Sequence, residues 1–282
     1  PALVRELFKY DPRITHYITF PLKRKKKLST YWKIVRELRK ENGELGVIFV
    51  NTFISALLFR LGNVKKNIGY NREGRGFLLD FSPEINYHKH YINRYAFLFN
   101  EYIGNKYVYL PELSLRYTGQ KTFQFDNSHK TIALYLGGEN KEFRKYPDEY
   151  AVQLLRLLNR QGYNLLLIGD ENDNIKHTQY AEEARIDHLI NLTARTTIEG
   201  FINTIANVDL IITIDSSALH IAAAVKTPFI ALMGLSTSPT STILPKVPLG
   251  RILKIENNLI REEDYIRNIT PDLILKTISE LI

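Results

Sequence analysis

Residues 208–233 contain the pattern that most constrains the fold of this chain. Residues 208–214 are a short apolar run rich in Ile, which is typical of a strand buried on both faces. A polar turn follows at 215–217, then a predicted helix at 218–225 and a second buried strand at 229–233. We interpret this order as a βαβ unit. Its polar turn would lie at the carboxyl end of a parallel strand, where open α/β sheets bind ligands.

The polar turn is suited to bind an anion. Ser216 or Ser217 can cap the helix, and the remaining free amides of its first turn would face outward with the positive end of the helix dipole. His220 lies within that turn and can donate a hydrogen bond to the same anion. The helix terminus would lower its pKa and a bound diphosphate would raise it. The alternative is that Asp215 and Ser216 only cap the helix and that His220 is a packing residue.

Charge is unevenly distributed along the chain. The net charge is +8, but residues 1–125 hold 22 Lys or Arg against 10 Asp or Glu, whereas residues 126–282 carry −4. The first half is therefore expected to meet an acidic partner. Its densest cluster, Lys-Arg-Lys-Lys-Lys at 23–27, is either a solvated loop or a recognition site. An anionic membrane surface or a phosphorylated glycolipid fits, and no nucleic-acid-binding motif is found.

Composition and motifs exclude several classes of protein. The chain contains no Cys, which excludes disulfides and thiolate metal sites. No apolar run approaches the roughly 18 residues of a membrane span and no signal peptide is visible, so we expect a cytosolic protein. The zinc-protease, dinucleotide and P-loop fingerprints are missing from the sequence. The Gly137-Gly138 pair after a predicted strand fits backbone approach to a ligand, and a tight turn explains it equally well.

Alternating strands and helices predict two α/β domains with parallel sheets, assigned to residues 1–125 and 126–282 with a linker at 114–129. In the first domain we expect helices at 3–10, 29–41, 52–61 and 91–103, and strands at 14–20, 45–50 and 66–70. In the second, besides the βαβ unit at 208–233, we expect strands at 131–136, 163–168 and 188–191. We expect helices at 147–162, 197–207 and 271–282, and one more that begins after residue 171 and ends at about residue 185.

Three stretches of the second half resemble the ADP-heptose:lipopolysaccharide heptosyltransferases, glycosyltransferase family nine. They are LYLGGENKEFRKYPDEYAVQLL, LLLIGDEND and INLTARTTIEGFINTIANVDLIITIDSSALHIAAAVKTPFIALMG. The family pattern combines a Gly-containing loop, a Lys-Arg-Trp-Pro-like segment, and an Asp-Ser-Gly-x-x-His stretch followed by an Ala-rich helix and Thr-Pro. The resemblance is strong over residues 130–245 and weaker over the first half.

This resemblance implies a GT-B fold, in which two Rossmann-like doubly wound domains face a cleft. The carboxyl-terminal domain would hold a nucleotide-sugar, expected to be ADP-heptose, and the amino-terminal domain a phosphorylated glycolipid acceptor at the inner membrane surface. The implied reaction is inverting transfer to a lipopolysaccharide core or related glycan in the cytoplasm, without metal or cofactor. The alternative is a catalytically degenerate GT-B module that binds nucleotide or acidic glycan. Nucleic-acid binding is a third hypothesis, and no feature points to an oligomeric state.

Carried over by position, the resemblance also assigns roles to residues of the second half. The donor nucleotide would be bound by Gly137, Gly138, Lys145, Glu171, Asp215, Ser216 and Ser217. Arg144 lies where the family has a Lys that neutralises the phosphates. Arg144 and His220 would stabilise the charge of the departing diphosphate and are the predicted catalytic residues. Asp173 is an alternative to Glu171 for holding a ribose hydroxyl.

Departures from the family pattern concern the turn and the start of the chain. Ser217 replaces the usual Gly, and Arg144 presents a planar fork in place of a point donor. The family's general base is an Asp in a strand and loop that would precede Pro1, and neither Asp11 nor Glu37 lies in a suitable element. We therefore expect this sequence to be a shortened form of an enzyme, able to bind donor but slow to turn it over.

Overall fold

The computed structural model describes residues 2–19, 28–109, 111–234, 240–254 and 261–282. It divides into two compact units. The N-terminal unit comprises residues 1–5, 14–112 and 241–243, and the C-terminal unit comprises 6–13, 113–240 and 244–282. The segment 113–125, which the sequence analysis assigned to the first domain, belongs to the second unit, because Leu113, Leu115, Phe123 and Phe125 pack on its core.

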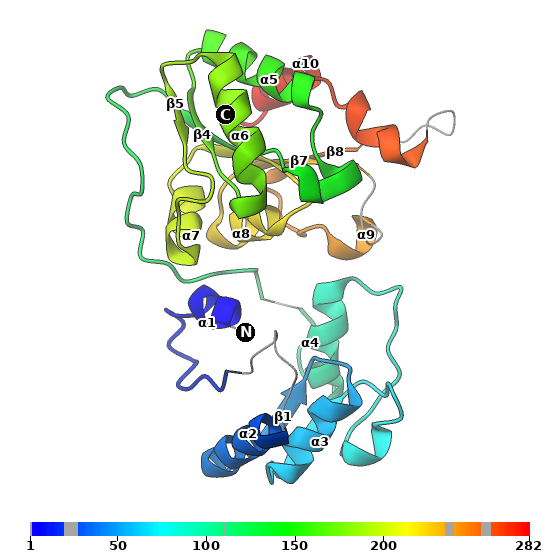
Figure 1. Cartoon of the computed structure of the whole chain (residues 1–282). Helices are drawn as coiled ribbons and strands as arrows, with labels where there is room; N and C mark the ends of the chain where they lie inside the picture. The colour runs from blue at the N-terminus through cyan, green and yellow to red at the C-terminus, as the bar shows by residue number, and fades with distance from the viewer. Residues whose placement is uncertain (1, 20–27, 110, 235–239, 255–260) are drawn as a thin grey trace. The chain divides into compact units, whose positions relative to one another are not determined.

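A six-stranded parallel sheet forms the centre of the C-terminal unit (Figure 1). Its strands are β3 (Thr131–Tyr135), β4 (Asn164–Leu167), β5 (Leu189–Asn191), β6 (Leu210–Ile214), β7 (Phe229–Leu232) and β8 (Gly250–Leu253). Their order is β5-β4-β3-β6-β7-β8, and every neighbouring pair is parallel. This order is that of a doubly wound Rossmann sheet, and its direction reverses between β3 and β6. The predicted doubly wound architecture is therefore confirmed for this unit.

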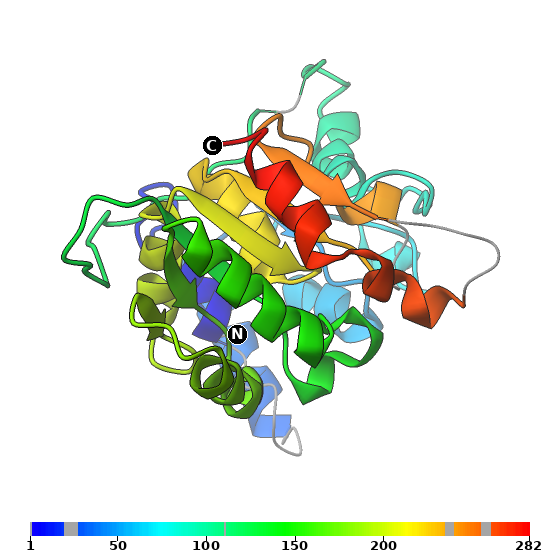
Figure 2. The same ribbon diagram turned by 90° about the horizontal axis from the view of Figure 1, so that it is seen from above.

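Helices cover both faces of this sheet. They are α5 (Asp148–Arg160), α6 (Asn174–Ala184), α7 (Ile198–Ala206), α8 (Ser217–Val225) and α10 (Pro271–Ile278). Helix α5 contacts α6 and α10, whereas α7 contacts α8. Figure 2 shows α5 and α10 next to each other. Every residue of β3, β4, β6 and β7 is buried, as expected for parallel strands with helices on both faces.

Two boundaries in this unit differ from the sequence prediction. Pro147 is the residue before α5, not its first turn, and Gly162 follows the helix in the left-handed conformation, with φ of +81°. Strand β8 was not predicted, because the pattern Gly-Arg-Ile-Leu lies at the sheet edge with its residues exposed or half-buried. A short helix, α9 (Thr240–Ile243), precedes it.

The N-terminal unit contains α2 (Leu28–Glu41), β1 (Leu45–Ile48), α3 (Phe53–Leu61), β2 (Lys66–Gly69) and α4 (Tyr91–Tyr102), and α1 (Ala2–Leu7) begins the chain. Strands β1 and β2 are parallel. The strand predicted at 14–20 is wrong for residues 14–19, which are described and form no strand; residue 20 lies outside the described residues. A strand requires a hydrogen-bonded neighbour, and within the described part of this unit β1 pairs only with β2.

No helix in the described ranges is long and apolar enough to cross a membrane.

Candidate functional site

The predicted site residues lie in three loops of the C-terminal unit. The first loop follows β3 and contains the 3-10 helix η2 (Glu139–Arg144), the second follows β4 and contains η3 (Glu171–Asp173), and the third joins β6 to α8. Strands β4, β3 and β6 are consecutive and parallel in the sheet. Their carboxyl ends therefore meet at one edge, beside the point where the strand order reverses. The fold thus brings the residues predicted from sequence to a common edge.

Ser216 is the N-cap of α8, which decides between the two serines that the sequence offered. Its backbone is extended, its side chain accepts a hydrogen bond from the Ala218 N–H at 3.2 Å, and its Oγ lies 3.0 Å from Thr213 Oγ1. Ser217 is the first residue of the helix and is exposed. The first turn contains no acidic side chain that would neutralise the positive end of the helix dipole. The helix terminus can therefore accept an anion.

His220 is exposed on this first turn, whereas the carboxylate before it is nearly buried. Asp215 is 9% exposed, and Ala218 and Leu219 are fully buried against the sheet. His220 therefore does not belong to the apolar core. Contact of its imidazole with a ligand at the helix terminus stays a prediction.

Gly137 and Gly138 are required by contacts inside the protein. Gly137 has a φ of +81°, and a Cβ there would lie 2.6 Å from Ile214 Cδ1. A Cβ on Gly138 would lie 2.4 Å from the carbonyl oxygen of Asn172 and 2.7 Å from the Cα of Asp173. The loop after β3 is therefore a tight turn that also lies directly against the loop after β4. Contact of either glycine with a ligand stays a prediction.

Arg144 and Lys145 have different surroundings at the end of η2. Arg144 is half-buried, and none of the described carboxylates pairs with it. Lys145 pairs at 2.7 Å with Asp148, which also accepts hydrogen bonds from Lys176 at 2.9 Å and from the Tyr180 hydroxyl at 2.5 Å. Partial burial would raise the pKa of Asp148, but these three donors lower it to about 2. The charge of Lys145 is thus engaged at the start of α5, whereas the guanidinium of Arg144 can pair with an incoming anion.

Tyr146, which the resemblance places where the family has Trp, anchors this loop to the interior of the unit. It is fully buried, and its hydroxyl donates to the carbonyl oxygen of Ile269 at 2.8 Å. Burial raises the pKa of the hydroxyl, which stays protonated and available as a donor. The position of Arg144 is therefore tied to the segment before α10.

Glu171 and Asp173, the two candidates for a ribose hydroxyl, are distinguished by burial. Glu171 is exposed, whereas Asp173 is fully buried. Asp173 Oδ2 accepts a hydrogen bond from the Asp170 N–H at 2.9 Å, and Asp170 Oδ1 accepts one from the Asn172 N–H at 2.8 Å. These reciprocal bonds form a capping box around η3. The exposure of Glu171 and the burial of Asp173 favour Glu171 as the carboxylate of η3 that faces a nucleotide, and this contact stays a prediction.

A buried histidine beside this turn was missed by the sequence analysis. His177 is fully buried, and its Nδ1 lies 2.7 Å from Thr193 Oγ1. Burial lowers the pKa of His177 to about 4, although the charges of Asp173 and Asp170 oppose this effect. The available signal was the spacing of four residues from Asp173, the N-cap of α6, to His177 in that helix, which brings the two side chains near each other.

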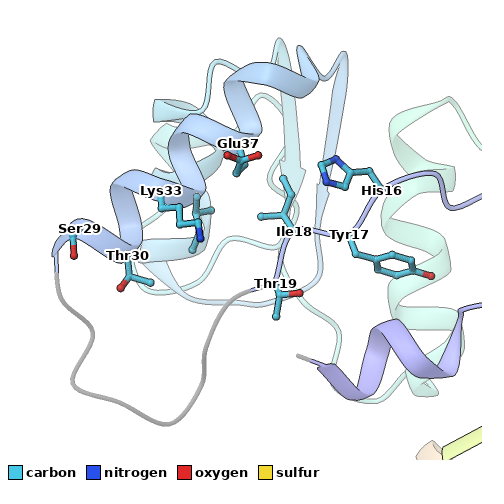
Figure 3. Close-up of a pocket in the computed structure, with 9 residues that line it drawn as sticks. His16, Tyr17, Ile18, Thr19, Ser29, Thr30, Lys33 and Glu37 are labelled. Carbon is cyan, nitrogen blue, oxygen red and sulfur yellow. The ribbon is translucent and has the colours of Figure 1, made fainter.

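The N-terminal unit contains a separate cavity of about 610 Å³, shown in Figure 3. It is lined by His16, Tyr17, Ile18, Thr19, Ser29, Thr30, Lys33, Ile34 and Glu37. Figure 3 shows Lys33 and Glu37 extending from α2 toward the segment that carries Ile18. His16 pairs with Glu41, and Glu37 accepts a hydrogen bond from Lys40 at 2.8 Å. The cluster at 23–27 lies outside the described residues.

Neither internal carboxylate considered as a general base has a suitable pKa. The hydrogen bond from Lys40 lowers the pKa of Glu37. The side-chain hydrogen bond from Arg13 lowers the pKa of Asp11 to about 2. A general base that works near neutral pH needs a raised carboxylate pKa. Both groups are therefore weaker bases than an ordinary carboxylate.

Comparison with known proteins gives consistent results at the level of sequence. The profile of glycosyltransferase family 9 (heptosyltransferase) matches residues 31–263. Lipooligosaccharide heptosyltransferase 2 of Haemophilus influenzae is 26% identical over 309 residues, which cover 100% of this chain and 89% of that protein. Lipopolysaccharide heptosyltransferase 2 of Salmonella typhimurium is 22% identical over 314 residues, which cover 100% and 88%.

Solved structures are similar over nearly the whole chain. The ADP-heptose lps heptosyltransferase II of E. coli superposes with a TM-score of 0.83 at 22% identity, covering 100% of this chain and 87% of that one. The E. coli heptosyltransferase WaaC with ADP has a TM-score of 0.69 at 15% identity, covering 90% and 78%. These similarities confirm the predicted GT-B fold class. Since the family profile also spans most of the sequence, this chain belongs to glycosyltransferase family 9, the heptosyltransferases.

Proposed function

We propose that this chain transfers heptose from ADP-heptose to a lipopolysaccharide core or related glycan, with inversion and without a metal ion. The observation that carries the proposal is the amino end of α8, where Ser216 is the cap, Ser217 and His220 are exposed and the first turn contains no acidic side chain. The named activities of the relatives support this assignment, as does the solved WaaC structure with ADP-2-deoxy-2-fluoro heptose.

The donor diphosphate would bind at the amino end of α8. The free amides of the first turn and the His220 imidazole donate hydrogen bonds to it, and Arg144 neutralises part of its charge. The exposed Glu171 would accept a hydrogen bond from a ribose hydroxyl. The hydroxyl of Ser217 is exposed and is not needed for the cap, so it can serve as a further donor to a phosphate oxygen.

Catalysis would then depend on charge at the leaving group. An acceptor hydroxyl attacks the anomeric carbon and loses its proton to a carboxylate base, while the bond from that carbon to the phosphate oxygen breaks. Negative charge accumulates on the departing ADP. The amides of α8, Arg144 and His220 stabilise this charge more strongly than they stabilise the bound donor, which lowers the barrier. We assign the role of this base to none of the carboxylates in the described residues.

The acceptor and its location form a second part of the proposal. The acceptor is a phosphorylated glycolipid at the cytoplasmic surface of the inner membrane, and the first 125 residues, with their net charge of +12, would face it. Membership of a glycosyltransferase family favours a glycan over nucleic acid as the acidic partner. Family membership also does not favour the catalytically degenerate alternative, in which the chain would bind ADP but would not transfer a sugar.

A thermal-shift screen of nucleotide-sugars tests the donor class. At a hundred times its Kd, an ADP-linked donor should stabilise the chain by about 2.7 kcal/mol, on the order of 5–10 °C in Tm. Matched UDP- and GDP-linked sugars should give much smaller shifts. Arg144→Ala should reduce the ADP shift, and Arg160→Ala, an exposed cation at the opposite end of α5, should leave it intact. Equal stabilisation by all three nucleotides would reject the ADP assignment.

A further inference from the structure

The buried carboxylate of Asp173 lies between the two loops that carry the predicted nucleotide contacts. Its Oδ2 accepts the Asp170 N–H at 2.9 Å, and a Cβ on Gly169 would lie 2.8 Å from the same oxygen. On the other side, Gly138 has no room for a side chain because the backbone at Asn172 and Asp173 lies against it. The carboxylate therefore fills a space that an apolar side chain could fill only by losing the bond to Asp170.

Buried polar groups also lie at the ends of the three adjacent strands β3, β4 and β5. Tyr135 ends β3, and burial raises the pKa of its hydroxyl, with Asp173 and Asp170 raising it further. His177 Nδ1 lies 2.7 Å from Thr193 Oγ1, after β5, and the Ala194 N–H donates to the Gly169 carbonyl after β4 at 3.2 Å. The residue before the 170–173 turn is thus hydrogen-bonded to the segment that follows β5.

We infer that Asp173 is a positioning residue for the donor nucleotide: it fixes the 170–173 turn against the Gly137-Gly138 loop and so presents Glu171 to the ribose. This inference rests on the proposed function. Asp173 is fully buried and its carboxylate accepts the backbone N–H of Asp170, so we assign its effect to the backbone of the turn. A turn that is already ordered loses less conformational freedom when the nucleotide binds. Loss of the carboxylate should therefore weaken binding of the donor and leave the chemical step nearly unchanged.

The chain offers a matched control for a purely structural role. Asp209 Oδ2 accepts the Thr131 N–H at 2.8 Å, a bond of the same kind that joins the amino ends of β3 and β6. It lies at the edge of the same sheet opposite to the candidate site. Asp209→Ala should reduce thermal stability without affecting nucleotide binding.

The test compares Asp173→Ala, Asp173→Asn and Asp209→Ala in the full chain. For Asp173→Ala we expect the Kd for ADP, measured by calorimetry, and the KM for ADP-heptose to rise about tenfold, with kcat within about twofold. Asp173→Asn keeps an oxygen that accepts the Asp170 N–H, so it should restore binding to within about threefold of wild type. Hydrogen exchange at residues 170–173 should be faster in Asp173→Ala than in Asp209→Ala.

The outcomes separate this inference from the proposed function. Wild-type protein that binds no ADP would overturn both. Wild-type binding with an unchanged Kd in Asp173→Ala, or an equal loss of binding in Asp209→Ala, would overturn the positioning role alone. If Asp173→Ala does not fold, Gly138→Ala displaces the same turn from its other face. Faster exchange at 170–173 in that variant with an unchanged Kd would equally overturn the inference.

Discussion

Acidification from pH 7 to pH 4 should destabilise the C-terminal unit through the buried ring of His177. Burial lowers the pKa of this residue from 6.5 to about 4 in the folded protein. Between these values the unfolded chain binds a proton that the folded chain does not, so the free energy of unfolding falls as the pH falls. Each pKa unit corresponds to about 1.4 kcal/mol, which gives a loss of about 3 kcal/mol by pH 4, and the loss ends below that pH.

The assay isolates this contribution with a non-titrating variant. His177→Gln keeps a polar group that can bond to Thr193 and removes the titration. Urea unfolding of the C-terminal unit, followed by hydrogen exchange of peptides from β3 and β6, should show wild type losing about 3 kcal/mol more than His177→Gln between pH 7 and pH 4. His188→Gln, at an exposed histidine of the same unit, should leave the wild-type slope unchanged. Parallel curves for wild type and His177→Gln, or an NMR titration of His177 near 6.5, would refute the reasoning.

Other predictions address catalysis, the N-terminal unit and metal dependence. Arg144→Ala and His220→Ala should each lower kcat for transfer by about a hundredfold, the effect of removing one donor to a developing anion, and Arg160→Ala should not; wild-type rates in an active protein would remove both residues from the mechanism. Arg75 is fully buried and donates to the Tyr70 carbonyl after β2 and to three acceptors before and within the first turn of α3, at Asn51, Thr52 and Ser55. Arg75→Ala should lower the free energy of unfolding of the N-terminal unit by about 3–5 kcal/mol, measured by urea unfolding followed through the fluorescence of Trp32. A change below about 1 kcal/mol would contradict this expectation. Prior treatment with EDTA should leave the initial rate unchanged, and restoration of a lost rate by added divalent ions would contradict metal independence.

Buried strands were predictable because both faces of the parallel sheet are covered. Runs such as residues 210–214 are then apolar without alternation, and a single sequence suffices to find them. The edge strand β8 carries no such signal, since Arg251 and Ile252 are exposed. Residues 14–19 illustrate the opposite error: a local pattern can favour an extended backbone, but only a neighbouring chain makes it a strand.

The candidate site was predictable where its geometry is local. The spacing of Ser216 and His220 places both on the first turn of one helix, whatever surrounds it. The choice between Glu171 and Asp173 is not local. It depends on burial, which is set by the packing of the loop after β4 against the distant Gly138 and Thr193, with Asp173 buried and Glu171 exposed.

The departure at Ser217 follows the same distinction between local and tertiary geometry. A side chain in place of the usual Gly would obstruct a diphosphate if it pointed at the amides of the first turn. In this chain Ser216 supplies the cap, and Ser217 occupies the first helical position with its side chain exposed. The hydroxyl therefore does not compete for the amide used in the cap. Because a serine hydroxyl is itself a donor to phosphate oxygens, we expect the substitution to change how a diphosphate would be held and to leave the helix terminus available to it.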